Sequence, residues 1–276
     1  MYKSKQYNKD ENRLIEAIKG NDARKIADMC EVNSNLMNNM KNNVLFIVAV
    51  SEGIEANTIA TLIEFGANPL AKDPEFKYTC LHLTAHRNPK YVIDILGIYY
   101  GLLLDNKGLD EVTAKKKLAE FINIPNNDGY TVIHHVLGLD DKNTELRQFL
   151  LKHGGDINAR DNDGETVAHM CIKQITESGE RAKRDPVQME YDRFVIIERF
   201  VEEGLDPTIK DNSGRTVLDS ISEKYRNRIK AQASKSSMAE KVVASRYNSN
   251  EGYDSDTSSM AAKVKASRYN CTCMIL

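Results

Sequence analysis

Histidines and cysteines are the side chains of this sequence whose types and spacing could do chemistry. His82 and His86 stand four residues apart, and on a helix this spacing places two imidazoles on one face, as in a zinc site. Leu-Thr-Ala separates them, so the glutamate that a zinc protease carries beside its first histidine is missing. Cys80 and Cys171 each lie two residues from a histidine, but such neighbours point to different faces of a helix, and buried cysteine is usually core. The pattern predicts neither a metal site nor a catalytic thiol.

Motifs for phosphate or acyl-transfer chemistry are missing from the sequence as well. It contains no glycine-rich phosphate loop, no G-x-S-x-G and no set of kinase motifs. The formal net charge is -2, whereas a chain that binds nucleic acid usually carries a basic excess. We therefore expect a protein that is not an enzyme, uses no cofactor and does not bind nucleic acid.

The last four residues, Cys273-Met-Ile-Leu, indicate a different chemistry. They fit C-a-a-X, the acceptor for prenylation, and the terminal leucine favours a geranylgeranyl group. One lipid holds a protein at a membrane only marginally, so a second signal is usual. Cys271 could be palmitoylated, and three basic residues precede it: Lys263, Lys265 and Arg268. We therefore expect Cys273 and Cys271 to be lipidation sites, with a prenyltransferase and a membrane surface among the partners.

Two other uses of this C-terminus stay open. Met274 and Leu276 alternate before a free carboxylate, as in a ligand for a PDZ-type domain. A signal for a bacterial secretion machine is also compatible with prenylation, because a secreted effector would use the prenyltransferase of its host. With the lipid we expect a cytoplasmic, membrane-associated protein, in the host cell if it is a bacterial effector. Without it we expect a soluble cytosolic scaffold or inhibitor.

An internal repeat indicates which elements position the candidate residues. Three segments align: NIPNNDGYTVIHHV from Asn123, NARDNDGETVAHMC from Asn158 and TIKDNSGRTVLDSI from Thr208. Each has a polar turn ending in glycine, one variable residue, threonine, two apolar residues, and then histidine or aspartate. KYTCLHLTAH from Lys77 enters the same frame at Thr79, and NNVLFIVAV from Asn42 keeps only its apolar positions. Such self-similarity is the signature of a repeat architecture.

The positions of glycine and threonine in this repeat indicate where helices start and end. A glycine ends each turn where a positive φ is needed, at Gly129, Gly164 and Gly214. The threonine two residues later can cap the free N–H groups at the start of a helix. A second glycine follows an apolar run, as at a helix C-terminus, at Gly66, Gly154 and Gly204. Each unit is therefore predicted to contain a turn and two short antiparallel helices.

The repeat resembles the ankyrin repeat, whose TPLH-like signature is matched by TCLH at 79–82, TVIH at 131–134, TVAH at 166–169 and TVLD at 216–219. The resemblance covers about residues 10–230, with NRLIEAIKGNDARKIADMC as an N-terminal cap repeat. It implies an all-α ankyrin-repeat solenoid of about five to six units. It also implies that the signature histidines, His82, His134 and His169, hydrogen-bond between neighbouring turns.

Two departures from the ankyrin pattern predict local differences. Proline is missing from the second signature position in every repeat, so a preorganised helix start is lost. Taking Val44 and the four signature threonines as equivalent, the steps are 35, 52, 35 and 50 residues, where about 33 is usual. The two long steps predict insertions near 97–121, with an extended second helix and a further amphipathic helix, and near 176–188, between two helices.

The variable residue between glycine and threonine is the candidate for binding a protein partner. It lies at a hairpin tip, and ankyrin solenoids present these tips on a concave face. Aromatic residues and arginine dominate interface energetics, and these positions hold Tyr78, Tyr130, Glu165 and Arg215. Ordinary solvated turns are the alternative.

Residues 231–276 differ from the repeats in composition. SMAEKVVASRYN at 237–248 recurs as SMAAKVKASRYN at 259–270, with ten of twelve positions identical. Residues 228–276 hold eight Lys or Arg and four Asp or Glu, so this end is +4 and the rest of the chain -6. We expect a disordered basic tail that tethers a non-enzymatic, protein-binding adaptor to a membrane.

Overall fold

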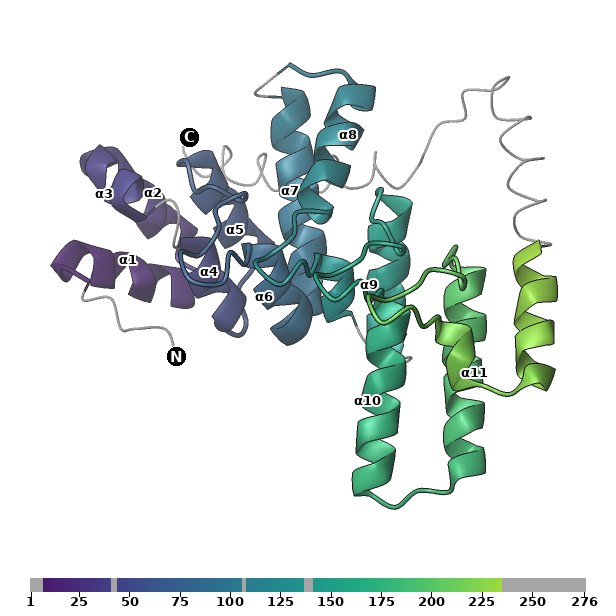
Figure 1. Ribbon diagram of the computed structural model, residues 1–276. Helices are drawn as coiled ribbons and strands as arrows, with labels where there is room; N and C mark the ends of the chain where they lie inside the picture. The colour runs from purple at the N-terminus through teal and green to yellow at the C-terminus, as the bar shows by residue number, and fades with distance from the viewer. Residues whose placement is uncertain (1–6, 41–43, 106–107, 137–140, 235–276) are drawn as a thin grey trace. The chain divides into compact units, whose positions relative to one another are not determined.

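The computed structural model describes residues 7–40, 44–105, 108–136 and 141–234 (Figure 1). These residues form two compact units, 7–121 and 122–234, and each is treated by itself. Within the described ranges the regular structure is helical, and the extended backbone contributes one isolated antiparallel bridge, between Lys210 and Thr216. The predicted all-α class is confirmed. The boundary predicted at 230 between repeats and tail stays a prediction.

The first unit begins with three short helices: α1 (Lys9–Lys19), α2 (Ala23–Val32) and α3 (Ser34–Met40). Asn8 caps α1 in a reciprocal box, because its side chain accepts from the Glu11 N–H at 2.9 Å while Glu11 accepts from the Asn8 N–H at 2.9 Å. Leu14, Ile18 and Ile26 are fully buried between these helices. The N-terminal cap repeat therefore has its own apolar core.

The repeats of the first unit stack in two rows. α4 (Val44–Val50), α5 (Ala56–Glu64), α6 (Cys80–Arg87) and α7 (Pro89–Asp105) follow along the chain. α1 contacts α4, which contacts α6, while α2 contacts α5, which contacts α7. Each helix pair therefore covers the apolar side of the pair before it, as in a solenoid whose units contact only their neighbours.

The first predicted insertion is confirmed as helical. α7 extends to 17 residues, and α8 (Glu111–Ile122) lies beside it (Figure 1). The Tyr99 and Phe121 rings meet edge to face with centroids 5.1 Å apart, which packs α8 onto α7. α8 is amphipathic, since Leu118 and Phe121 are buried while Lys115, Lys116 and Lys117 are exposed.

The second unit contains η1 (Val132–His135), α9 (Asp141–Lys152), α10 (Val167–Arg181), α11 (Pro186–Glu202), η2 (Val217–Ser220) and a helix over 223–234. α10 contacts η1, η2 and α11, so it lies at the centre of this unit. The predicted first helix is only a single 3-10 turn at η1 and η2. After η2, Ile221 is extended and the Ser222 N–H donates to Glu190 Oε1 at 2.6 Å, so the chain turns toward α11.

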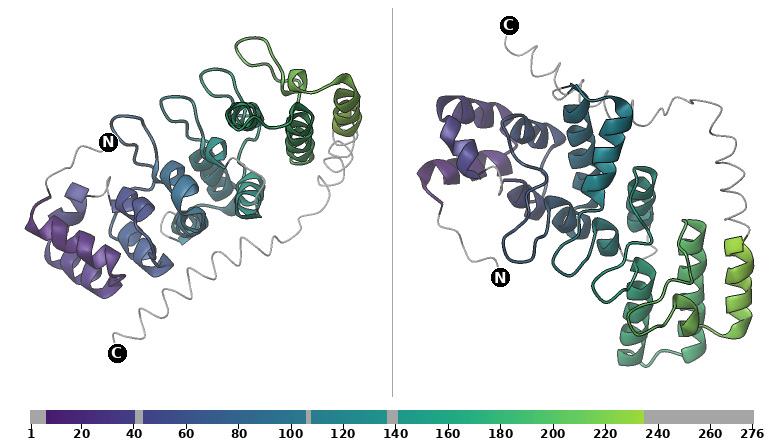
Figure 2. Two further views of the ribbon diagram at one scale, coloured as in Figure 1. Left: turned by 90° about the horizontal axis from the view of Figure 1, so that it is seen from below. Right: turned by 45° about the horizontal axis from the view of Figure 1, so that its top comes forward.

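Hairpin turns project to one side of the second unit, at 126–130, 161–165 and 211–215 (Figure 2). Each opens with Asn126, Asp161 or Asp211, whose side-chain oxygen accepts two backbone N–H groups of the turn at 2.7–2.9 Å. The glycines at 129, 164 and 214 have φ of 84, 74 and 80, as predicted. A Cβ at Gly129 would lie 2.7 Å from the backbone nitrogen of Asn162, so the turns also pack too closely for a side chain there.

Asparagine side chains join each turn to the next. Asn123 donates to the Gly154 carbonyl at 2.7 Å and accepts from the Asp156 N–H at 2.9 Å. Asn158 repeats both bonds one unit later, with Gly204 at 3.1 Å and Asp206 at 2.7 Å. Because these asparagines satisfy backbone groups that follow the helix-ending glycine, they fix the spacing between successive repeats.

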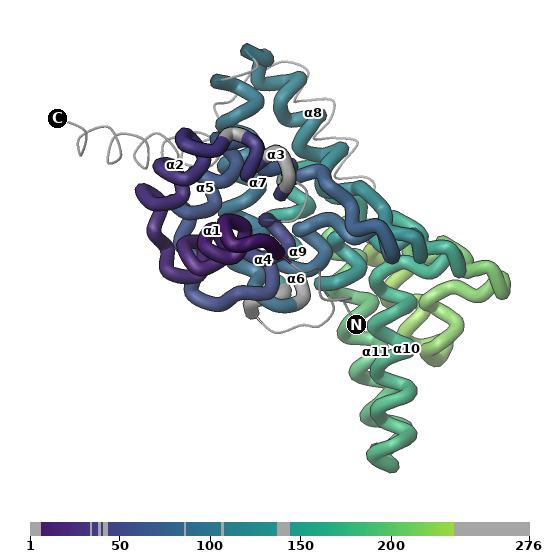
Figure 3. Tube along the Cα trace, turned by 90° about the vertical axis from the view of Figure 1, so that its left-hand side faces the viewer, coloured from purple at the N-terminus to yellow at the C-terminus, as the bar shows by residue number. Residues whose placement is uncertain are grey.

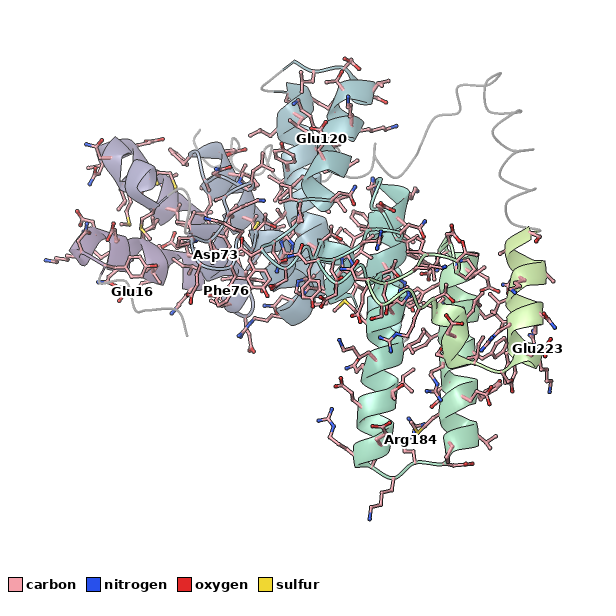
Figure 4. All side chains as sticks on the ribbon, viewed as in Figure 1. Glu16, Asp73, Phe76, Glu120, Arg184 and Glu223 are labelled. Atoms are coloured by element: carbon pink, nitrogen blue, oxygen red, sulfur yellow. The ribbon has the colours of Figure 1, made fainter. Side chains whose placement is uncertain are left out.

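The second predicted insertion, near 176–188, comprises the end of α10, the turn that follows it and the start of α11, so it lengthens both helices. α10 has 15 residues and α11 has 17, and the pair extends past the other elements of its unit (Figure 3). Arg184 lies at the turn between them (Figure 4). A Cβ on Gly179 would lie 2.6 Å from the end of the Met189 side chain, so glycine permits the close approach of the two helices.

A buried ion pair fixes the end of α11 against α9. The Arg147 side chain is fully buried, and its guanidinium donates from Nη2 to Glu203 Oε1 at 2.9 Å and from Nε to Glu203 Oε2. The same guanidinium lies 4.6 Å from the centroid of the Phe200 ring. A bidentate pair with a stacked ring compensates the desolvation of the charge.

Candidate protein-binding face

The four signature turns share one hydrogen-bond pattern, with threonine at the N-cap and the fourth signature residue as its partner. Nδ1 of the histidine accepts the threonine N–H at 3.0–3.2 Å in three turns. Asp219 does the same in the fourth turn, where its Oδ2 accepts from the Thr216 N–H at 2.7 Å and from Oγ1 at 3.0 Å. Because Nδ1 accepts a hydrogen bond from the threonine N–H, the neutral histidines carry their proton on Nε2. We call this Thr-x-x-His/Asp arrangement the signature box.

The histidines therefore bond within their own turn. Toward the neighbouring turn, as the ankyrin resemblance implies, His134 interacts with the backbone of Glu165 and Ala159, and His169 with the backbone of Arg215. Burial lowers the pKa of His134, while the Asp161 carboxylate and the backbone of Glu165 and Ala159 oppose this. Burial lowers the pKa of His169 too. Both rings are structural and neutral near pH 7.

Tyr78 and Tyr130 occupy equivalent places in different units. Each is half-buried, and each ring lies 5.7 Å from the ring of its signature histidine, His82 or His134. Tyr78 also lies 6.0 Å from the ring of Phe76, which is exposed. The aromatic rings at these tips thus rest on the signature box and keep one edge accessible.

Glu165 and Arg215 line a single groove of about 370 Å³ in the second unit. Glu165 lies 3.5 Å from Lys173, and Arg215 lies 3.2 Å from Asp211. We call this cavity the α10–η2 groove. The first side, from Glu165 and α10, consists of Glu165, His169, Ile172, Lys173, Thr176 and Glu177; the second consists of Asp211, Arg215, Thr216, Val217, Asp219 and Ser220.

The groove exists because the two sides differ in length. α10 runs for 15 residues, and one of its faces carries groove residues at a spacing of three to four, from His169 to Glu177. The facing element η2 stops after 4 residues, so it covers only the start of that face. Ile172 and Val217 supply apolar surface, and four carboxylates with two cations supply charge.

Ion pairs and turn contacts keep the groove side chains charged. Glu165 raises the pKa of Lys173. The Thr216 N–H and hydroxyl lower the pKa of Asp219. Burial opposes ionisation of Asp211, but the Arg215 and Ser213 N–H groups and the Arg215 guanidinium lower its pKa. A partner therefore meets fixed charges in this groove.

Comparison with known proteins matches this architecture. An ankyrin repeat protein of Acanthamoeba polyphaga mimivirus is 27% identical over 208 residues, covering 73% of this chain and 24% of the viral protein. Proteins named ankyrin repeat and SOCS box protein 6, from Homo sapiens and Pongo abelii, are each 25% identical over 168 residues, covering 53% of this chain and 40% of theirs. No family model matches the chain.

The chain is an all-α ankyrin-repeat solenoid. It spans less than half the length of these relatives. The ankyrin hairpins and α10 bring Glu165 and Arg215 together and place Tyr130 in the preceding turn of the same unit, while Tyr78 belongs to the other unit. Cys271 and Cys273 lie outside the described residues.

Sequence reasoning missed the α10 side of the groove. Lys173 and Glu177 were not singled out, although they follow the signature threonine Thr166 at helical spacing. That spacing predicts the same helix face as His169. The usable signal was the apolar and charged periodicity that continues past the signature at 166–169 but not past 216–219.

Cys80 and Cys171 are buried, and burial raises the pKa of the Cys80 thiol to about 12. Within the described ranges, no three His, Cys, Asp or Glu side chains cluster as metal ligands would. His82 is engaged by Thr79. None of the helices described between residues 7 and 234 is both long enough and apolar enough to span a membrane.

Proposed function

We propose that this chain is a non-enzymatic adaptor that binds a protein partner through its hairpin tips and the α10–η2 groove. The observation that supports this is the convergence of an arginine, fixed carboxylates and apolar surface in one groove beside a half-buried tyrosine. Interfaces gather their binding energy in a few such aromatic and arginine side chains. Ankyrin relatives support a protein-binding role.

Tyr130 and Arg215 are the anchors we expect to matter most. Arg215 is largely exposed and engages Asp211, so the turn presents its guanidinium already oriented. Glu165 is mostly buried and paired to Lys173, and we expect it to orient that lysine toward a partner. Tyr78 would extend the contact if the partner also reaches the first unit.

The test is a comparison of captured proteins between the full chain and two variants. We expect Tyr130→Ala with Arg215→Glu to remove a defined set of proteins and to weaken binding of a purified member more than tenfold, as for interface hot spots. Glu180→Lys is the matched control, because Glu180 is exposed on α10 but does not line the groove. Equal capture by all three proteins would contradict the proposal.

We also propose that a lipid on Cys273, supported by Cys271 or nearby basic residues, holds the adaptor at the cytoplasmic face of a membrane. The C-a-a-X pattern is the support, and a tether raises the local concentration of whatever the repeats bind. A role as a secreted bacterial effector inside a host cell stays a prediction.

Intact-mass measurement of the protein made in animal cells tests this part first. A prenyl adduct with loss of Met-Ile-Leu is the expected result, and it also establishes that Leu276 ends the chain in the cell. Cys273→Ser should then move the protein from membrane to cytosol. An unmodified mass and an unchanged distribution would leave the soluble scaffold as the function.

A further inference from the structure

We propose that residues 259–270 of the chain's own tail, SMAAKVKASRYN, occupy the α10–η2 groove and that a protein partner must displace them. This inference rests on the proposed function, which assigns partner binding to the α10–η2 groove, and it names the segment that fills the groove when no partner is bound. It makes the adaptor autoinhibited, since one surface would serve both the tail and the partner.

The groove has the charge to accept a basic segment. Four carboxylates, Glu165, Glu177, Asp211 and Asp219, face two cations, Lys173 and Arg215, so its formal charge is 2 - 4 = -2. Glu165 and Asp211 are engaged by those cations at 3.5 and 3.2 Å. Glu177 on α10 and Asp219 on η2 are exposed on the two sides. Glu177 has a 4.0 Å ion pair with the exposed Arg181, and Asp219 accepts from Thr216.

The groove also offers features that a peptide could complement. Ile172 and Val217 provide apolar surface between the two carboxylates. His169 beside them is already engaged by the Thr166 N–H and by the backbone of Arg215, so a peptide would meet the apolar pair and the two exposed carboxylates.

Residues 259–270 match these features better than their duplicate. Lys263, Lys265 and Arg268 give this copy a charge of +3, and Met260 and Val264 add apolar side chains four residues apart. The copy at 237–248 carries Glu240, Lys241 and Arg246, so its charge is only +1. The sequence therefore supplies both an occupant and a natural control for it.

Chain length permits this contact without a second molecule. The helix over 223–234 starts three residues after Ser220 of the groove and is roughly 18 Å long at 1.5 Å per residue. From residue 234 to residue 259 the chain can span up to about 80 Å. A tethered segment has an effective concentration on the order of millimolar, so a weak intrinsic affinity suffices to fill the groove.

Carbodiimide cross-linking of the full chain, at a concentration where it is monomeric, tests the contact directly. We expect amide links from Lys263 or Lys265 to Glu177 or Asp219, identified by mass spectrometry. Glu177→Lys should lower the yield of links to Asp219 about fivefold, because an attraction becomes a repulsion. Sodium chloride at 1 M should lower it as well, since the Debye length falls to about 3 Å.

A charge exchange separates a specific contact from general tail mobility. Combining Glu177→Lys with Lys263→Glu and Lys265→Glu should restore links between position 177 and the tail, whereas Glu180→Lys should leave the wild-type pattern unchanged. Links from Lys241 as frequent as those from Lys263 would overturn the choice of segment. Links found only in covalent dimers, or none to the groove, would overturn the intramolecular contact.

The two proposals fail in distinguishable ways. If the tail does not link to the groove but Tyr130→Ala with Arg215→Glu still loses partners, the adaptor stands and the autoinhibition falls. If the tail links to the groove but no variant changes partner capture, the groove serves the tail alone.

Discussion

Two signature turns of the second unit, at 166–169 and 216–219, begin in the same way and end differently. Thr166 with His169 and Thr216 with Asp219 form equivalent boxes, with the threonine N–H held at 3.2 and 2.7 Å. The first turn continues as α10 to Arg181, and the second stops at Ser220. The comparison shows that the signature determines where a helix starts, while the residues after it determine its length.

Binding surface arises from that difference in length. Two helices of similar length can cover each other more fully, and α4 and α6 of the first unit, with 7 and 8 residues, are in contact. Here α10 extends past η2, and Thr176 and Glu177 remain available beside Asp219 and Ser220. An irregular repeat can therefore form a groove that a regular repeat would close.

The largest effect is expected where the long helix pair is anchored. Glu203→Ala removes the carboxylate that pairs with the fully buried Arg147, leaving a guanidinium without its bidentate partner. Breaking a buried pair in this way costs about 3–5 kcal/mol of unfolding free energy. Urea denaturation measures the change. Glu202→Ala, at an exposed neighbour that accepts a bond from Gln232, should stay within about 0.5 kcal/mol.

Features of the fold that depend on contacts within a few residues could be predicted from the sequence, and features that depend on contacts between distant residues could not. The turns were predictable because Gly129, Thr131 and their equivalents act within a few residues of themselves, and both insertions followed from the repeat spacing. The path of the chain after η2 was not, because the Ser222 N–H bonds to Glu190, 32 residues away. The groove was missed for the same reason. It needs two elements whose lengths are set separately.

Replacing the fourth residue of each signature box, His169 or Asp219, tests whether the two boxes stabilise their turns equally. His169→Ala leaves the Thr166 N–H unpaired at a fully buried residue, which costs about 1–3 kcal/mol in addition to the lost ring packing. Asp219→Ala frees the N–H of a partly exposed threonine, and water can replace the bond, so about 0.5–1 kcal/mol is expected. Thermal unfolding of both variants should rank them in this order, and the reverse order would show that the boxes are not equivalent.

Acid should also distinguish the two kinds of box. Burial holds the pKa of His134 and His169 below the ordinary 6.5, so the unfolded chain binds protons before the folded chain does. Their contribution to stability is therefore complete above about pH 6.5 and decreases as the pH falls toward the folded pKa. The pKa of Asp219 is lowered from 3.8 by the Thr216 N–H, so its contribution is lost only below about pH 4.

Unfolding free energies measured between pH 4.5 and 7.5 check this smallest effect. The wild-type chain should lose stability steadily below pH 6.5. His169→Asp, which gives the α10 turn the box of the η2 turn, should reduce that slope, because a histidine with a lowered pKa is gone. Asp219→Asn should leave the slope unchanged in this range and alter stability only at lower pH. A His169→Asp protein with the wild-type slope would mean that the buried imidazole is not what makes the long turn sensitive to acid.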